Sequence, residues 1–260
     1  MGFCINFAAK TMIPALKIAA VSYLNTFPFV YGIRASGYLN NYLLDLEVPT
    51  LCADKLKQEE VDIALVPVGA LPEIKDYHIV SPFCLGAVKE VRSVLLLSHH
   101  PLQKIRKIFL DIDSRTSVKL VKILAKHFWR INPEYESVHI GQLPDTKQPQ
   151  AVVAIGDKTF AMRNHYPYVY DLAGEWIKFT ELPFVFALWI SKRGLPDSLT
   201  DPFCKALSYG ILHKRESLEY FKDKLPEDED CLRYLEENIS YDFDDRKKQG
   251  LFEFLNFPDD

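Results

Sequence analysis

The sequence predicts an α/β protein of two lobes with a ligand-binding cleft between them. In the first half of the chain, short apolar strands alternate with helices, which is the pattern of a βαβ sheet. A second α/β stretch follows. About 90 residues after the strand expected at 91–98, a comparable apolar strand recurs at 182–194. We therefore expect the chain to cross into a second lobe and to return.

The first three strands and the helices between them are the clearest part of the pattern. Strands are expected at 16–22, 42–50 and 61–68, and helices at 29–37 and 53–60. The strand at 61–68 is almost entirely apolar, as expected for a parallel strand that is covered on both faces. The first helix should end at Gly37, because glycine is favoured just after the last helical residue.

The rest of the chain supplies the second lobe and a helical C-terminal part. Strands are expected at 83–88, 91–98, 107–114, 151–157 and 182–194, helices at 114–129 and 157–164, a surface loop around one short strand at 133–150, and polar-faced helices from about 199 to 257. The expected division is lobe one at 15–97 plus 189–260, lobe two at 98–188, and an N-terminal extension at 1–14.

Composition narrows the class of partner. Apolar residues make up 48% of the 260 residues and charged residues 25%, the balance of a soluble globular protein. The net charge is −4 and no basic tract occurs, so we expect neither nucleic acid nor a membrane surface as partner. No apolar run is long enough to span a bilayer. A local pocket can still be positive, so an anionic small molecule remains possible.

The cysteines and histidines show no pattern of a metal site or a disulfide framework. Five scattered cysteines include no CxxC pair, which favours free thiols in a reducing cytoplasm. The start of the chain superficially resembles a signal peptide, but Lys17 interrupts its apolar stretch, so a cytoplasmic location is expected. No metal-ligand spacing is present, and no metal is expected.

Polar residues cluster where the predicted elements meet the cleft. The clusters are Ser22, Tyr23, Asn25 and Thr26 after the first strand; Ser114, Arg115, Thr116 and Ser117 at the start of a helix; and Gly156 with Asp157 after another strand. Hydroxyls and free N–H groups at a helix N-terminus suit a carboxylate or a phosphate. Each cluster also has a structural interpretation, as a turn, a capped helix or a strand-to-helix turn. Ser93, within an apolar strand, is either a satisfied core hydroxyl or a residue beneath the cleft.

Four segments in order resemble one enzyme family. The segments "VSYLNTFPF", "DIDSRTSVKL", "AIGDKT" and "LAGEWIKFTELPFVFALW" are similar to those of the chorismate dehydratases of the futalosine route to menaquinone. The resemblance runs from about Lys17 to the C-terminus. It implies a fold like that of type II periplasmic binding proteins. A sister family of the same route, the dihydroxynaphthoate synthases, carries a Ser-Pro-Cys-Pro-Asn type of first loop, and Ser-Tyr-Leu-Asn-Thr in this chain favours the dehydratase.

The resemblance implies that chorismate loses water to give 3-[(1-carboxyvinyl)oxy]benzoate. Aromatisation drives this reaction, so it implies no metal, redox cofactor or covalent nucleophile. Thr116 and Ser117 would bind one substrate carboxylate, and Asn25 and Ser93 match positions near the reacting ring. Neither Asn25 nor Ser93 is a strong base, so either another residue or a substrate carboxylate takes the proton.

Two points stay open within this interpretation. Glu181 stands where many relatives have glycine, which puts the role of that loop in doubt. The same fold also commonly serves non-catalytic solute-binding proteins, so a carboxylate-binding module is the alternative to an enzyme.

Overall fold

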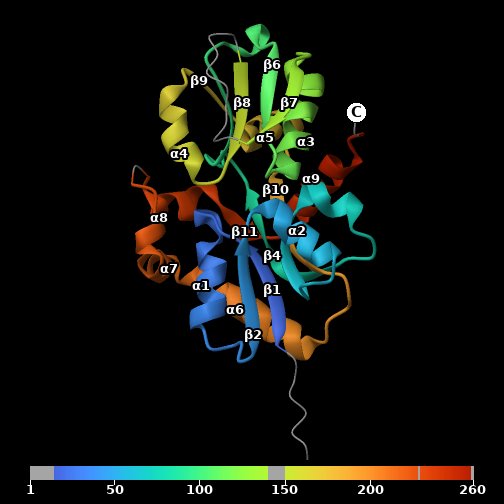
Figure 1. The fold of residues 1–260 in the computed structure, drawn as a ribbon, viewed down its shortest axis with the longest axis vertical. Coiled ribbons are helices and arrows are strands. Elements are labelled where there is room, and N and C mark those ends of the chain that lie inside the picture. The colour runs from blue at the N-terminus through green and yellow to red at the C-terminus, as the bar shows by residue number, and fades with distance from the viewer. Residues whose placement is uncertain (1–14, 140–149, 228, 259–260) are drawn as a thin grey trace, which may run out of the picture.

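The computed structural model describes residues 15–139, 150–227 and 229–258. Among these residues the strands form two sheets, one of six strands and one of five. Figure 1 shows the sheets one above the other, with the five-stranded sheet uppermost. The expected extension at 1–14 lies outside the described residues, as does the middle of the expected surface loop.

The six-stranded sheet is mixed, in the order β11-β4-β10-β3-β1-β2. Its strands are β1 (Leu16–Val21), β2 (Tyr42–Glu47), β3 (Ile63–Pro67), β4 (His78–Ala87), β10 (Phe184–Ser191) and β11 (Ser240–Asp242). β1 pairs in parallel with β2 and β3, which confirms the predicted βαβ unit. The return strand β10 runs antiparallel between β3 and β4.

The five-stranded sheet has the order β7-β6-β8-β5-β9. Its strands are β5 (Val94–Ser98), β6 (Lys107–Asp111), β7 (Glu134–Val138), β8 (Gln150–Ile155) and β9 (Tyr168–Asp171). β6 pairs in parallel with β7 and β8, whereas β5 is antiparallel to both of its neighbours.

Helices cover both sheets. They are α1 (Phe27–Ala35), α2 (Pro49–Lys57), α3 (Arg115–Ile123), α4 (Lys158–Met162), α5 (Leu172–Thr180), α6 (Asp197–Leu212), α7 (Lys214–Tyr220), α8 (Cys231–Arg233) and α9 (Asp245–Asn256). α2 packs on β1 and β3, α6 on β4, and α9 on β10, while α3 and α4 contact β8 and α5 contacts β5 and β9. α1 and α6 approach closely, because a Cβ at Gly32 would lie 1.9 Å from the Ala206 carbonyl oxygen.

The chain does not cross between the lobes at residues 98 and 188, where the crossings were expected. β5 pairs with β8 and β9, so this strand, which was assigned to lobe one, lies in the second sheet. Phe184 of β10 pairs with Ala87 of β4, so the first sheet already includes the residues before 189. An apolar strand pattern shows that a strand exists but does not say which neighbours it joins. Residues 88–93 and the segment just before β10 are therefore the crossings.

Two local features also depart from the expectations. The helix expected at 114–129 is α3 followed by a π-helical segment, Leu124–Trp129. The C-terminal part, expected to be helical, contains the short strand β11 and a second π-helical segment, Tyr234–Asn238. β11 extends the first sheet beside β4, so the end of the described chain returns to lobe one.

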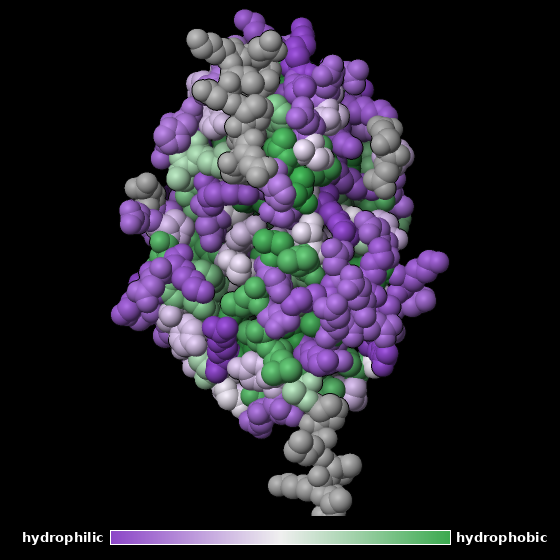
Figure 2. All heavy atoms as spheres, viewed as in Figure 1, coloured by the Kyte–Doolittle hydropathy of each residue, from purple (hydrophilic) through white to green (hydrophobic). Residues whose placement is uncertain are grey.

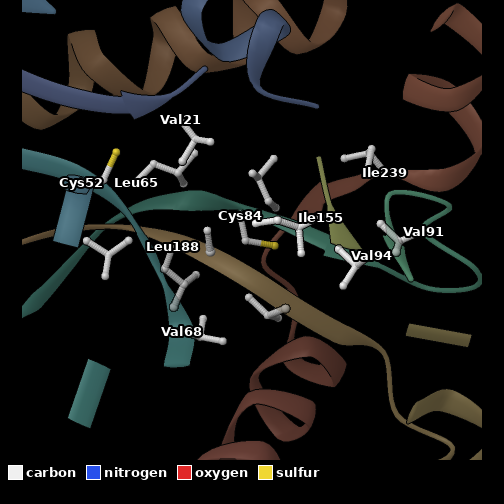
Figure 3. Close-up of a cluster of buried hydrophobic side chains, with 14 of the residues drawn as sticks. Val21, Cys52, Leu65, Val68, Cys84, Val91, Val94, Ile155, Leu188 and Ile239 are labelled. Carbon is white, nitrogen blue, oxygen red and sulfur yellow. The ribbon is translucent and has the colours of Figure 1, made fainter. Parts of the chain in front are cut away.

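One buried apolar cluster extends through both lobes. It joins Val21 and Leu65 of the first sheet to Val94 and Ile155 of the second. Figure 3 shows these side chains together with Val91 from the crossing segment. The two lobes thus share a continuous hydrophobic core. On the outside, Figure 2 shows polar residues over most of the visible face, with apolar residues gathered towards its middle.

Candidate active site

A cavity lies where the two sheets meet. It is lined by Val21, Tyr23, Asn25, Pro49, Pro67, Leu85, Val91, Ser93, Val94, Ser114, Thr116, Ser117, Ile155, Gly156, Phe186 and Ala187. Its volume is about 60 Å³, well below the roughly 300 Å³ or more of typical ligand pockets. A ligand that contains a six-membered ring therefore requires the lobes to move apart.

Asn25 reaches the cavity from a 3₁₀ turn, Leu24–Thr26, that follows β1 directly. Tyr241 of β11 anchors this turn, because its hydroxyl donates to the Asn25 carbonyl oxygen at 2.9 Å. The Asn25 side-chain oxygen is buried and has no hydrogen-bond partner among the described residues. A buried acceptor without a partner is costly, so this atom is suited to receive a hydrogen bond from a ligand.

Ser93 reaches the cavity from the crossing segment. Its main chain is fixed, because the Asp171 carboxylate accepts the N–H groups of Val91 at 3.1 Å and Arg92 at 2.6 Å. Arg92 has a left-handed backbone, with φ of 64°. Such conformations in non-glycine residues often occur at functional sites. The Ser93 Oγ lies 2.7 Å from the Tyr234 hydroxyl, so Ser93 is a hydrogen-bonded residue beneath the cleft.

The N-terminus of α3 forms another wall of the cavity. Ser114 is its N-cap, and its hydroxyl accepts the Ser117 N–H at 3.2 Å. The Thr116 Oγ1 accepts the N–H of Gly69, from lobe one, at 3.0 Å. The Ser117 hydroxyl lines the cavity and has no hydrogen-bond partner among the described residues. Ser117 is thus the hydroxyl of this wall that remains available to a carboxylate.

Gly69 explains why lobe one approaches α3 so closely. A Cβ at this position would lie 2.7 Å from the Thr116 nitrogen and 2.8 Å from the Arg115 carbonyl oxygen. Real Cβ atoms do not approach backbone atoms this closely, so any other residue would hold the two lobes apart.

Tyr23 and Gly156 meet across the cavity. Gly156 has φ of 72°, and a Cβ there would lie 2.9 Å from the Tyr23 ring. Glycine is thus required both by the backbone conformation and by the close approach of the ring. Burial raises the pKa of Tyr23, and the nearby carboxylates of Asp111 and Asp113 raise it further. Tyr23 therefore remains a neutral phenol.

Asp157 connects the lobes and does not line the cavity. Its two carboxylate oxygens lie 3.0 and 3.1 Å from the backbone nitrogen of Leu24, which donates its N–H. Burial raises the pKa of Asp157 to about 6, and the hydrogen bond from Leu24 opposes that rise. The structure thus assigns Asp157 to the contact between the lobes.

Three further predicted site residues point elsewhere. Ser22 is exposed, and the Thr26 hydroxyl bonds within its own turn, 2.5 Å from the Val21 carbonyl oxygen. The Arg115 guanidinium lies on the outer side of α3 and pairs with Asp54 at 2.9 Å and Glu73 at 3.1 Å. Arg115 therefore joins the lobes at the surface and does not supply positive charge to the cavity.

The apolar walls and Tyr234 are absent from the residues predicted from the sequence. Tyr234 begins the second π-helical segment and is fully buried. The one sequence signal available was a tyrosine on the core face of a helix, because a buried tyrosine hydroxyl usually requires a partner. That signal does not identify the partner, which lies 141 residues earlier in the chain.

The cavity is electrically neutral along the part of its wall that the structure describes. None of its lining residues carries a charge. Within the described ranges, no three His, Cys, Asp or Glu side chains gather to hold a metal ion, and no helix is long and apolar enough to cross a membrane. Cys52, Cys84, Cys204 and Cys231 are free thiols, while Cys4 lies outside the described residues. Hydroxyls, an amide and backbone N–H groups are therefore the polar groups that the cavity offers to a ligand.

Comparison with solved structures identifies the fold. Protein AF1704 from Archaeoglobus fulgidus superposes with a TM-score of 0.70 at 15% identity, covering 93% of this chain and 95% of that one. The alkanesulfonate-binding protein SsuA from Xanthomonas axonopodis pv. citri, bound to MOPS, gives 0.60 at 14%, covering 95% of each chain. The CA3427 product of Candida albicans, described as having the generic periplasmic binding protein fold, gives 0.53 at 14%, covering 95% and 92%. The predicted periplasmic-binding-protein-like fold is confirmed.

Comparison of sequences identifies the family. The chorismate dehydratase of Thermus thermophilus is 26% identical over an alignment of 252 positions, which covers 89% of this chain and 91% of that protein. The family described as "Menaquinone biosynthesis" matches residues 16–258, almost the whole chain. The chain therefore belongs to the menaquinone biosynthesis family.

Proposed function

We propose that this protein is a chorismate dehydratase, which eliminates water from chorismate to give 3-[(1-carboxyvinyl)oxy]benzoate. The observation that carries the proposal is the meeting, in one uncharged cavity, of Asn25, Ser93 and the hydroxyl-rich N-terminus of α3. The similarity to the Thermus thermophilus enzyme points to the same reaction. The free thiols favour a cytoplasmic location, which we include in the proposal.

The cavity suits the shape and charge of chorismate. The substrate has a six-membered ring, two carboxylates and one ring hydroxyl. Apolar residues such as Val94, Ile155 and Phe186 would pack against the ring. The Ser117 hydroxyl and the N–H groups at the start of α3 would receive one carboxylate, since a helix N-terminus favours an anion.

The reaction breaks two bonds on adjacent ring carbons. The proton at C3 is acidified by the ring carboxylate through the diene, and the hydroxyl leaves from C4. The proton and the hydroxyl depart together as one water, and the ring becomes aromatic. Because aromatisation supplies the driving force, the protein must mainly hold the substrate, exclude water and assist the leaving hydroxyl.

Ser93, whose hydroxyl is held by Tyr234, is the group best placed to donate a hydrogen bond to the leaving hydroxyl. The Asn25 side-chain oxygen, without a partner among the described residues, can only accept a hydrogen bond and so would orient the substrate. No lining residue is ionisable at neutral pH in the described part of the cavity wall. A substrate carboxylate is therefore the base that this arrangement favours.

The first experiment mixes the purified protein with chorismate, without any added cofactor, and follows the mixture by mass spectrometry and ultraviolet absorbance. A product lighter by one water, with the absorbance of a benzoate, is expected. Ser93→Ala should lower kcat/KM at least about 100-fold, as removal of a transition-state donor does. Asn25→Ala, which removes an orienting hydrogen bond, should lower it about 10-fold. Ser98→Ala is the matched control, because Ser98 is a buried serine of β5 whose hydroxyl accepts the His100 N–H instead.

Other outcomes distinguish the alternatives. Chorismate that binds tightly and is returned unchanged would indicate a solute-binding protein. Chorismate that neither binds nor reacts would overturn the proposal and reopen the sister synthase activity, which is then tested with its own substrate.

A further inference from the structure

Tyr234 lies at the junction of the two lobes, behind the candidate catalytic residues. Its side chain is fully buried, and its ring packs edge-on against Phe160 of α4, with the centroids 5.1 Å apart. Its hydroxyl lies 2.7 Å from the Ser93 Oγ. A segment near the C-terminus of lobe one therefore reaches the residue that connects lobe one to lobe two.

Both partners of this contact are held firmly. Ser93 is fixed through Asp171, and its carbonyl oxygen accepts the Gly156 N–H at 2.9 Å. The π-helical segment that carries Tyr234 is fastened at its other end, where the Asn238 side chain donates to the Glu90 carbonyl oxygen at 2.9 Å. π-Helical segments are rare and often occur at functional sites. The distance between the two hydroxyls is thus set by the fold.

A hydrogen bond between two hydroxyls uses the hydrogen of only one of them. If Tyr234 donates, the Ser93 hydroxyl hydrogen is free to point into the cavity. If Ser93 donates, its hydrogen points at Tyr234 and is not available to a ligand. Burial raises the pKa of Tyr234, and the hydrogen bond with Ser93 opposes that rise. Tyr234 consequently keeps its proton and can act as the donor. A phenol is also a stronger donor than an aliphatic alcohol, and donation to Ser93 strengthens the hydrogen bond that Ser93 itself donates.

We propose that Tyr234 is a positioning residue, which donates its phenolic hydrogen to Ser93 and so directs the Ser93 hydroxyl towards the hydroxyl that leaves the substrate. The inference rests on the proposed dehydratase function. Tyr234 acts through Ser93 and does not line the cavity itself.

Tyr234→Phe removes only the hydroxyl and tests this role. The expected result is a fall in kcat of about 10-fold or more, the effect of one lost hydrogen bond, with KM changed less than about twofold. Because Tyr234 acts through Ser93, the double variant Tyr234→Phe/Ser93→Ala should be no slower than Ser93→Ala alone. The matched control is Tyr170→Phe, which loses a hydroxyl that accepts the Leu102 N–H within lobe two.

The proposal is overturned by an unchanged kcat in Tyr234→Phe, by a change confined to KM, or by losses that multiply in the double variant. If the phenylalanine variant does not fold, 3-fluorotyrosine at position 234 keeps the hydroxyl and makes it a stronger donor. A higher kcat is then expected, and an unchanged kcat overturns the proposal.

A crystal structure of Tyr234→Phe separates this inference from the proposed function. The Ser93 side chain is expected to leave its rotamer once its partner is gone. A Ser93 side chain that keeps its rotamer overturns the positioning role, whatever the activity. Wild-type protein that leaves chorismate unchanged overturns the proposed function, and the crystal structure still decides the role of Tyr234.

Discussion

The Asp157 carboxylate accepts the backbone N–H of Leu24 from the opposite lobe, with both oxygens within 3.1 Å of the Leu24 nitrogen. Arg115 makes a second connection on the outer side of α3, where it pairs with Asp54 and Glu73. Asp157 and Arg115, which the sequence suggested as ligands of the substrate, therefore hold the two lobes together.

The Asp157 contact predicts a dependence of stability on pH. Its pKa in the folded protein is about 6, above the ordinary value of 3.8. The folded state therefore favours the protonated form, and the stability that this gives below about pH 4 is lost as the pH rises through 6. Asp157→Asn removes the buried charge and can still accept the Leu24 N–H. At pH 7.5 it should raise the free energy of unfolding by about 1–3 kcal/mol.

Urea unfolding between pH 4 and 8 measures this effect. The gain of Asp157→Asn should shrink towards pH 4, where wild-type Asp157 is also neutral. The control is Asp201→Asn, which alters an exposed carboxylate of α6 and should follow the wild-type profile. A difference between Asp157→Asn and the wild type that is the same at every pH would contradict the argument.

Gly156→Ala should damage both stability and activity. An alanine there would adopt a left-handed backbone, at about 1–2 kcal/mol, and its Cβ would press on the Tyr23 ring. Gly37 is the matched control, because its φ is 74° but a Cβ there would have no neighbour within 4 Å. Gly37→Ala should show the backbone effect alone, with kcat/KM unchanged. Equal loss of stability in the two variants, by urea unfolding, would mean that the ring moves aside easily.

Alanine substitutions of Ser114 and Ser117 should distinguish the effect on the stability of α3 from the effect on ligand binding. Ser114 is the N-cap, so Ser114→Ala should lower the free energy of unfolding by about 1 kcal/mol. The Ser117 hydroxyl binds none of the described residues, so Ser117→Ala should leave stability nearly unchanged. A hydrogen bond to a carboxylate contributes roughly 1.5–3 kcal/mol, so its loss should raise KM for chorismate about 10-fold or more. Initial rates and urea unfolding of both variants test this assignment, and an unchanged KM in Ser117→Ala would remove the residue from the site.

Glu181→Gly should stabilise the protein. Glu181 ends α5 in a left-handed conformation, with φ of 62°, and donates its N–H to the Ile177 carbonyl oxygen. Glycine adopts this conformation without strain, so glycine suits this position. The gain should be about 1 kcal/mol in thermal or urea unfolding. Glu181→Ala removes the same charge but keeps the Cβ, so it should show none of the gain; an equal gain in both would assign the effect to the charge.

The sequence predicted the fold and several of the polar residues that line the cavity, because strand patterns and helix starts depend on local chemistry. The apolar run at 61–68 identifies a buried parallel strand wherever it pairs, and Ser114 to Ser117 identify a helix N-terminus. The direction of a side chain depends on contacts far along the chain. Arg115 points outward because Asp54 and Glu73 lie there. Tyr234 was missed for the same reason, since nothing near it in sequence indicates Ser93.

Lobe one is built from two separate stretches of the chain, and this has a consequence for the order of folding. Lobe two is one continuous stretch, so its strand pairs join residues closer in sequence than β10 and its neighbours are, and contacts of lower sequence separation form earlier. The first sheet needs β10 between β3 and β4, more than 100 residues after β3 along the chain, and long-range pairing of this kind is slow. Ser93 and Gly156 should therefore reach their places before Tyr234 arrives. We expect a refolding chain to gain its second sheet first and its catalytic competence last.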